Sequence, residues 1–175
     1  MARGIPRPDE PEKHPRRRVP GWVSWEKYQV VHQHYMQLLY DEGVVSDDTL
    51  SFVETVESGE IVQVRLEGEV VCASGVRVRV LKWLAAERRT RNRIYVRTTF
   101  YQYHAWRLPA AGQPPAQSIL RYDQAHGSGL HRHHFDPAGK QVRHVEVSPD
   151  AMPTLEEVIR EANELGSTTP DSRHM

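Results

Sequence analysis

Five of the ten histidines of this chain lie between positions 121 and 144, together with an aspartate and several arginines. The five are His126, His131, His133, His134 and His144. Imidazole changes its charge near neutral pH, so a cluster of histidines can transfer protons, hold a metal ion or bind phosphate. A hydrophobic core has no use for such a set, and this stretch is therefore the candidate functional site.

Cleavage of an RNA phosphodiester needs a base, an acid and a cation that stabilises charge on the phosphate. In an extended segment His131 and His133 share one face, while Arg132 and His134 point the other way. We expect His131 and His133 to transfer the protons, with Asp123 orienting a histidine and His126 beside them. The residues expected to contact the substrate are Arg121, Tyr122, Arg132 and His134, with Tyr122 stacking on a base.

Two other interpretations of the same residues stay open. His131 and His133, joined by Asp123 or His126, would give three zinc ligands and an open fourth position. Alternatively, Asp123 caps a Gly-Ser-Gly turn and the histidines form a solvated face of a hairpin. The catalytic interpretation requires no metal and no cofactor.

A rival function uses another part of the chain. Residues 88–93 are rich in arginine, and residues 95–103 are rich in aromatic side chains. Arginine clusters contact phosphate, so these residues predict a non-enzymatic module that binds nucleic acid or a protein partner.

The composition limits the class of protein. Lysine plus arginine and aspartate plus glutamate both number 23, so the net charge steers the chain toward neither nucleic acid nor membrane. Cys72 is the single cysteine, which excludes an intramolecular disulfide and a cysteine-rich zinc module. No apolar run approaches the roughly 20 residues that span a bilayer. We expect a soluble cytoplasmic protein without a membrane partner.

The apolar periodicity predicts an α+β fold. A helix follows Ser24 and ends near Gly43, and a second, amphipathic helix begins with the capping box of Thr154 and Glu157 and ends at Gly166. Between them we expect a meander-like antiparallel sheet of about six strands, apolar on one face and wet on the other. The second helix should cover the apolar face, and the first should pack at an edge or against a partner.

The expected strands are bounded by turn residues. They cover residues 50–56, 61–66, 70–72, 76–84, 94–108, 118–122 and 142–147, with a polar stretch at 85–92. The longest, 94–108, is expected to be either a central strand or a strand bent by a bulge near Gln102. The expected organisation is a disordered tail at 1–20, a helical extension at 21–45, an α+β domain at 46–166 and a disordered tail at 167–175.

The stretch from 50 to 165 resembles the TumE family of bacterial and archaeal toxin–antitoxin loci. The specific part is Arg121-Tyr122-Asp123-Gln124, His126, Gly127 and His131-Arg132-His133-His134. The resemblance implies a toxin that acts on RNA and is encoded beside a helix-turn-helix antitoxin, and it is compatible with a homodimer. Gln124 stands where the family pattern has asparagine, and the first 45 residues are an extension that typical members lack.

Overall fold

The computed structural model describes residues 21–90, 93–109, 116–124, 129–148 and 151–168. The tail expected at 1–20 lies outside the described residues, as does 169–175. Residues 167 and 168 of the second expected tail are described, and the C-terminal helix extends to Ser167.

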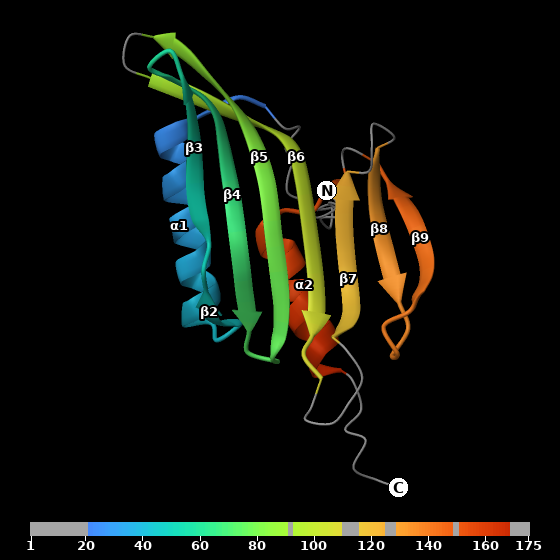
Figure 1. The fold of residues 1–175 in the computed structure, drawn as a ribbon. Coiled ribbons are helices and arrows are strands. Elements are labelled where there is room, and N and C mark those ends of the chain that lie inside the picture. The colour runs from blue at the N-terminus through green and yellow to red at the C-terminus, as the bar shows by residue number, and fades with distance from the viewer. Residues whose placement is uncertain (1–20, 91–92, 110–115, 125–128, 149–150, 169–175) are drawn as a thin grey trace, which may run out of the picture.

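The described chain folds into one antiparallel sheet and two helices, and the second helix follows the last strand (Figure 1). The helices are α1 (Trp25–Asp41) and α2 (Leu155–Ser167). The strands are β1 (Val23–Ser24), β2 (Val45–Asp48), β3 (Ser51–Glu57), β4 (Glu60–Cys72), β5 (Val76–Thr90), β6 (Arg93–Arg107), β7 (Gln117–Gln124), β8 (Leu130–Phe135) and β9 (Gln141–Val147).

The strand order confirms a meander and corrects the number of strands. From β4 to β9 each strand pairs with the next, while β2 and β3 both pair with β4 and β1 pairs with β6. The sheet has nine strands among the described residues, not about six. Strands β1 and β2 are too short to show a period-two pattern of apolar residues, and β8 carries polar residues on both faces. The sequence therefore gives no clear signal for these three strands.

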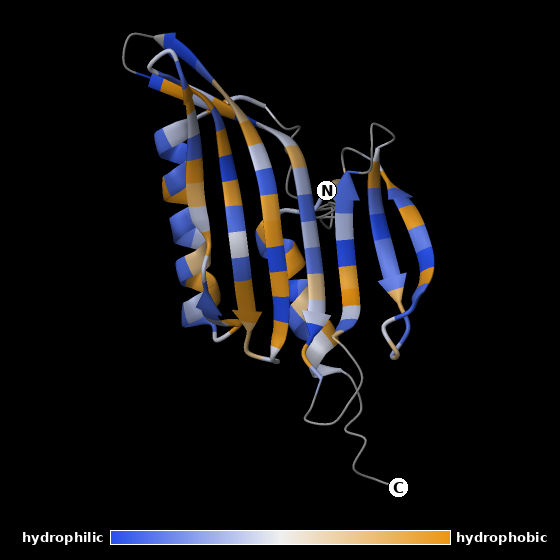
Figure 2. Cartoon of the chain, viewed as in Figure 1, coloured by the Kyte–Doolittle hydropathy of each residue, from blue (hydrophilic) through white to orange (hydrophobic). Residues whose placement is uncertain are grey.

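Both helices lie on the same face of the sheet (Figure 1). Along β5, Val76, Val78 and Val80 are buried beneath them, and Figure 2 shows hydrophobic and hydrophilic residues alternating along β4 and β5. Helix α2 contributes Leu155, Val158, Ile159 and Ala162 to this core. The face without helices is called the open face below. The predicted apolar and wet faces are therefore confirmed.

Helix α1 packs on the same face of the sheet as α2, on the side where β2 and β3 lie (Figure 1). Ser24 caps it by accepting a hydrogen bond from the backbone N–H of Lys27. Met36 and Leu39 join the same buried cluster as Ile159. At the other end of the helix, Trp25 packs with Val64, Leu84 and Val96 in a second cluster. The N-terminal helix is thus part of the core.

Strand β5 is longer than predicted, whereas β6 has the predicted length and begins one residue earlier. The polar stretch expected to interrupt β5 continues the strand as far as Thr90, because cross-strand backbone pairing does not require apolar side chains. The register of β5 and β6 shifts at Thr99, between Thr98 and Phe100, rather than near Gln102. Beyond this bulge, β6 is a central strand that pairs with β5 and β7.

Gly68 allows β4 to pair with both β2 and β3 along the same edge. The chain bends at residues 49 and 50, between β2 and β3, and passes directly over Gly68. A Cβ atom at Gly68 would lie 2.5 Å from the Thr49 carbonyl oxygen, and its φ of 140° disfavours other residues. With glycine at this position, β4 continues through residue 68, so one strand stands where two were expected at 61–66 and 70–72.

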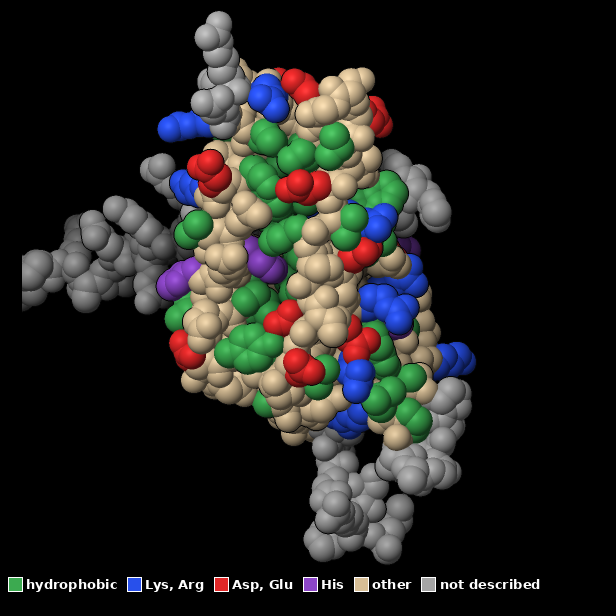
Figure 3. Space-filling model, turned by 60° about the vertical axis from the view of Figure 1, so that its left-hand side comes forward, with side chains coloured by type: hydrophobic (Ala, Val, Ile, Leu, Met, Phe, Trp, Pro, Cys, Tyr) green, Lys and Arg blue, Asp and Glu red, His purple; other side chains and the backbone are tan. Residues whose placement is uncertain are grey.

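No helix among the described residues is both long and apolar enough to cross a bilayer. Figure 3 shows hydrophobic side chains interspersed with acidic ones on the side of the molecule that carries α1 and β3. The exposed apolar residues there include Val30 and Val31 on α1 and Val53 and Val56 on β3.

Because of His32, the free energy of unfolding should depend on pH in the acid range. Burial between α1 and the sheet, reinforced by Lys82, lowers the pKa of His32 to about 4. Burial of the neutral His32 ring contributes its full stabilisation above the unfolded-state pKa of about 6.5. This contribution is lost as the pH falls toward 4, because the unfolded chain binds a proton on His32 before the folded chain does. We expect the free energy of unfolding to decrease over this window by up to roughly 3 kcal/mol because of His32.

Urea denaturation between pH 4 and pH 7 measures this dependence. His32→Gln should flatten the slope, whereas the control His34→Gln, at an exposed position of the same helix, should leave it as in the wild type. Equal slopes for His32→Gln and wild type would contradict the assignment.

Candidate active site

Strand alternation and register gather five side chains of the histidine stretch on the open face. The strand pairs Arg121↔His133 and Asp123↔His131 join β7 to β8, and His133↔His144 joins β8 to β9. Residues paired in this way point to the same side of the sheet. Arg121, Asp123, His131, His133 and His144 are called the histidine site below.

Asp123 is the buried centre of the histidine site. Its side chain is 8% exposed, and its Oδ2 lies 2.5 Å from Nη2 of Arg121. Its Oδ1 lies 3.3 Å from Nε2 of His133, whose side chain is 17% exposed. The carboxylate therefore holds a guanidinium on one side and an imidazole on the other, and it has little contact with water.

The imidazole rings of the site form a second group of contacts. Nδ1 of His133 lies 2.9 Å from Oε1 of Gln141, so both ring nitrogens of His133 face oxygen acceptors. Nε2 of His144 lies 2.8 Å from Nδ1 of His131. The ring centroids of His131 and His133 are 6.5 Å apart, and the His144 ring is stacked with that of His133 and tilted against that of His131. The three imidazole rings therefore lie side by side on the open face.

Three predicted substrate-binding residues lie on the opposite face, beneath α2. The Tyr122 hydroxyl donates a hydrogen bond of 2.9 Å to Glu161, and Arg132 forms an ion pair with the same carboxylate. The Arg132 guanidinium also lies over the Tyr122 ring. Burial, reinforced by Glu161, raises the pKa of Tyr122. Tyr122 and Arg132 thus tie α2 to the sheet.

His134 shares this helix-covered face. It pairs across the strands with Leu120 and Arg143. Burial, followed by the nearby Arg132 and Arg143, lowers the pKa of His134. Among the predicted catalytic residues, His126 lies outside the described residues. The structure therefore brings together Arg121, Asp123, His131 and His133 and separates them from Tyr122, Arg132 and His134.

The sequence prediction missed further residues of the open face. Starting at β4, one continuous row of strand partners contains Glu69, Arg79, His104, Arg121, His133 and His144. In the sequence Arg77 and Arg79 alternate with valines, and this period of two indicates that Arg79 faces solvent. Its place in line with His133 depends on the register of three strand pairs, which no local sequence pattern specifies. This line of residues is called the polar row below.

Within the described residues, no three side chains of His, Cys, Asp or Glu are grouped as ligands of a metal ion. The zinc site considered from His131, His133 and Asp123 is therefore not formed by those residues. The variant of that site that includes His126 lies outside the described part of the chain.

Neither a family model, nor a curated protein, nor a solved structure matches this chain. The resemblance to the TumE family stays a prediction that rests on the motif residues. The function is therefore inferred from the side-chain geometry.

Glu161 offers a test of the structural role of the helix-covered residues. Glu161→Ala leaves the Tyr122 hydroxyl and the Arg132 guanidinium without their shared acceptor, so it should lower the free energy of unfolding by about 1–2 kcal/mol. Chemical denaturation measures the change. Glu164→Ala, at an exposed position one turn further along α2, is the matched control and should change stability little. A Glu161 variant as stable as this control would argue against the tie between α2 and the sheet.

Proposed function

We propose that the histidine site cleaves the phosphodiester backbone of RNA by general acid–base catalysis, and that the protein is the toxin component of a toxin–antitoxin system. One observation carries the catalytic part of this proposal. A buried Asp123–His133 pair lies next to the His131–His144 pair and Arg121, on the sheet face that the helices leave open. An acid, a base and a cation are thus within reach of one phosphate.

His133 suits the role of the general acid. Its two neighbours, the Asp123 carboxylate and the Gln141 amide oxygen, both accept hydrogen bonds. In this role the ring gives the proton on Nδ1, the nitrogen that does not face Asp123, to the leaving oxygen. Asp123 fixes the orientation of the ring and stabilises its positive charge, as carboxylates do for catalytic histidines on other folds.

His131 suits the role of the general base. In its hydrogen bond with His144 one ring donates and the other accepts, so the pair needs only one proton between the bonded nitrogens. Nε2 of His131 is not engaged in this bond and can accept a proton from the substrate. His144 can hold His131 in position and share the charge that His131 gains.

The reaction balances without any further reagent. His131 removes the proton of a ribose 2′-hydroxyl, whose oxygen attacks the adjacent phosphorus. The bond from phosphorus to the 5′-oxygen of the next nucleotide breaks, and His133 protonates that oxygen. Arg121 stabilises the charge on the phosphate oxygens. The products are a 2′,3′-cyclic phosphate and a free 5′-hydroxyl, so the substrate must be RNA.

Substitution of the two histidines tests the catalytic assignment. His131→Ala and His133→Ala should each lower the rate of RNA cleavage by about 10²- to 10⁴-fold, the usual contribution of a general acid or base. The measurement is single-turnover cleavage of a labelled RNA by the purified full chain, with identification of the cyclic phosphate end. A DNA of the same sequence should not be cleaved.

His34→Ala is the matched control, because His34 is an exposed histidine on α1 and lies outside the histidine site. It should cleave RNA as the wild type does. Cleavage that survives in the His131→Ala, His133→Ala double variant would refute the assignment.

The resemblance to the TumE family supports the toxin role and names its partner, a helix-turn-helix antitoxin. Expression of the wild type in bacteria should therefore arrest growth, and the double histidine variant should not, because RNA cleavage would be the cause of toxicity. Co-expression with the helix-turn-helix protein encoded beside it should restore growth. Arrest by wild type and double variant alike would separate toxicity from the histidine site.

The basic and aromatic surface of the long β5–β6 hairpin supports a second candidate, a module that binds nucleic acid without turnover. Arg89 and Arg97 lie over the ring of Trp22, at 4.7 and 5.1 Å from its centroid, and Arg89 also lies over Tyr95. Arginine and aromatic side chains together bind single strands. RNA binding with a steep salt dependence and no cleavage by the wild type would favour this candidate.

A further inference from the structure

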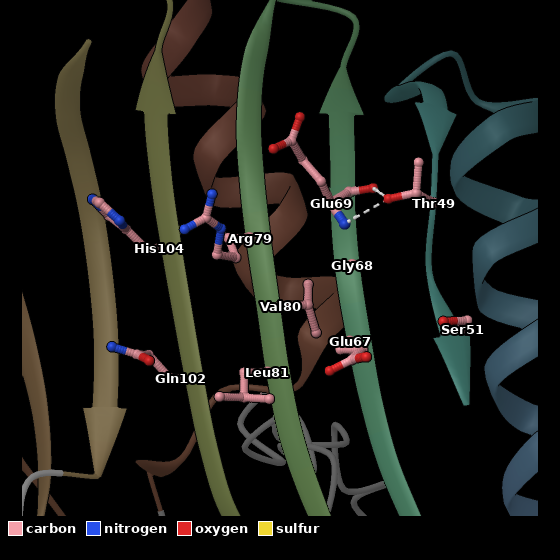
Figure 4. Close-up of a pocket in the computed structure, with 10 residues that line it drawn as sticks. All are labelled: Thr49, Ser51, Glu67, Gly68, Glu69, Arg79, Val80, Leu81, Gln102 and His104. Atoms are coloured by element: carbon pink, nitrogen blue, oxygen red, sulfur yellow. Dashed lines mark hydrogen bonds between the residues drawn. The ribbon is translucent and has the colours of Figure 1, made fainter. Parts of the chain in front are cut away.

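A pocket opens on the same face as the histidine site, over strands β4, β5 and β6 (Figure 4). Its volume is about 660 Å³. Arg79, Gln102 and His104 line one side, and Glu67 and Glu69 line the other. In Figure 4 α2 lies behind the sheet, so these side chains project away from the helices.

The polar row connects this pocket to the histidine site. Arg79 pairs with His104, His104 with Arg121, and Arg121 with His133 on successive strands. Adjacent strands are about 4.8 Å apart, so Arg79 and His133 lie roughly 14 Å from each other along the row. One extended ligand lying across the strands can reach both.

Arg79 is the cation of the pocket that is available to a ligand. Glu67 is paired with Arg65 at 2.6 Å, and Glu69 is paired with Arg77. Arg79 is exposed, and no carboxylate of the described residues lies within 4 Å of it. Its guanidinium lies 5.2 Å from the centroid of the Trp106 ring. A guanidinium stacked in this way keeps its in-plane N–H groups free for an anion, and phosphate matches their geometry.

His104 lies between the two guanidinium groups of the row. Burial, followed by Arg121 and Arg79, lowers the pKa of His104, so the ring is neutral at pH 7. Its Nε2 lies 2.9 Å from the Ser118 hydroxyl, which fixes the ring. Arg79 and Arg121 thus remain two separate positive charges of the row, with a neutral spacer between them.

We propose that this pocket is a second phosphate subsite, in which Arg79 binds a backbone phosphate of a single-stranded RNA whose scissile phosphate lies in the histidine site. The proposal rests on the proposed ribonuclease function and adds the direction of the substrate, which runs across the strands from β8 toward β5. It also adds a length requirement. A dinucleoside monophosphate has one phosphate and cannot occupy both subsites.

Binding to a non-cleaving chain tests the subsite independently of catalysis. In the full chain with His131→Ala and His133→Ala, Arg79→Gln should weaken the affinity for a labelled single-stranded RNA of about ten nucleotides by roughly tenfold, as for loss of one charge-assisted hydrogen bond. The slope of log Kd against log salt should fall by about 0.7, the value for one phosphate contact on a single strand. Fluorescence anisotropy over a range of salt concentrations measures both quantities.

Two further variants control for charge and for folding. Arg143→Gln removes the same charge from the opposite face of the sheet, where Arg143 pairs with His134, and should leave the slope unchanged. Arg79→Lys keeps the charge and should retain the slope while losing part of the affinity. Equal effects of Arg79→Gln and Arg143→Gln would overturn the subsite.

Cleavage by the chain with an intact histidine site separates the two proposals. There Arg79→Gln should raise KM for the longer RNA several-fold and leave the cleavage of a dinucleoside monophosphate unchanged. A wild type that cleaves nothing, combined with Arg79-dependent binding, would refute the ribonuclease function and retain the phosphate subsite. Cleavage of both substrates without any effect of Arg79→Gln would retain the ribonuclease function and refute the phosphate subsite.

Discussion

One antiparallel sheet covered by helices on a single face is the constraint on which the rest of this structure depends. Successive side chains of a strand point to opposite faces, so each strand contributes half of its residues to the core and half to the open face. Burial of Val78 and Val80 under α2 fixes the direction of Arg79. In the same way, burial of Leu120 and Leu130 turns Arg121 and His131 toward the open face.

The same alternation divides the histidine stretch into two parts with different roles. Tyr122 and Arg132 share the Glu161 carboxylate under α2 and join the helix to the sheet. Their neighbours Asp123 and His133 contact each other on the open face. A motif that is continuous in sequence therefore serves the core and the candidate site at once. This explains why arginine and tyrosine alternate with the acid–base residues.

Local patterns predicted much of the fold. The capping box at Thr154 and Glu157 and the apolar stripe around Ile159 place α2 correctly, because a helix is stabilised by contacts within a few residues. The same patterns failed at 85–90, where a polar run continues β5, and at Gly68, where one strand was expected to be two. Those outcomes depend on cross-strand hydrogen bonds and on the close approach of Thr49, which come from distant parts of the chain.

By itself, the sequence determined that Asp123 and the histidines form the chemically distinctive stretch, and that His131 and His133 point to one side while Arg132 and His134 point to the other. Side-chain type and the period of a strand are local properties, and they suffice for this. Only the tertiary structure decided that Arg121 rather than Arg132 shares the open face with them, that His144 contacts His131, and that Arg79 and His104 lie in line with His133. These facts follow from strand register and from the face that α2 covers, and both are set by packing between residues far apart in the chain.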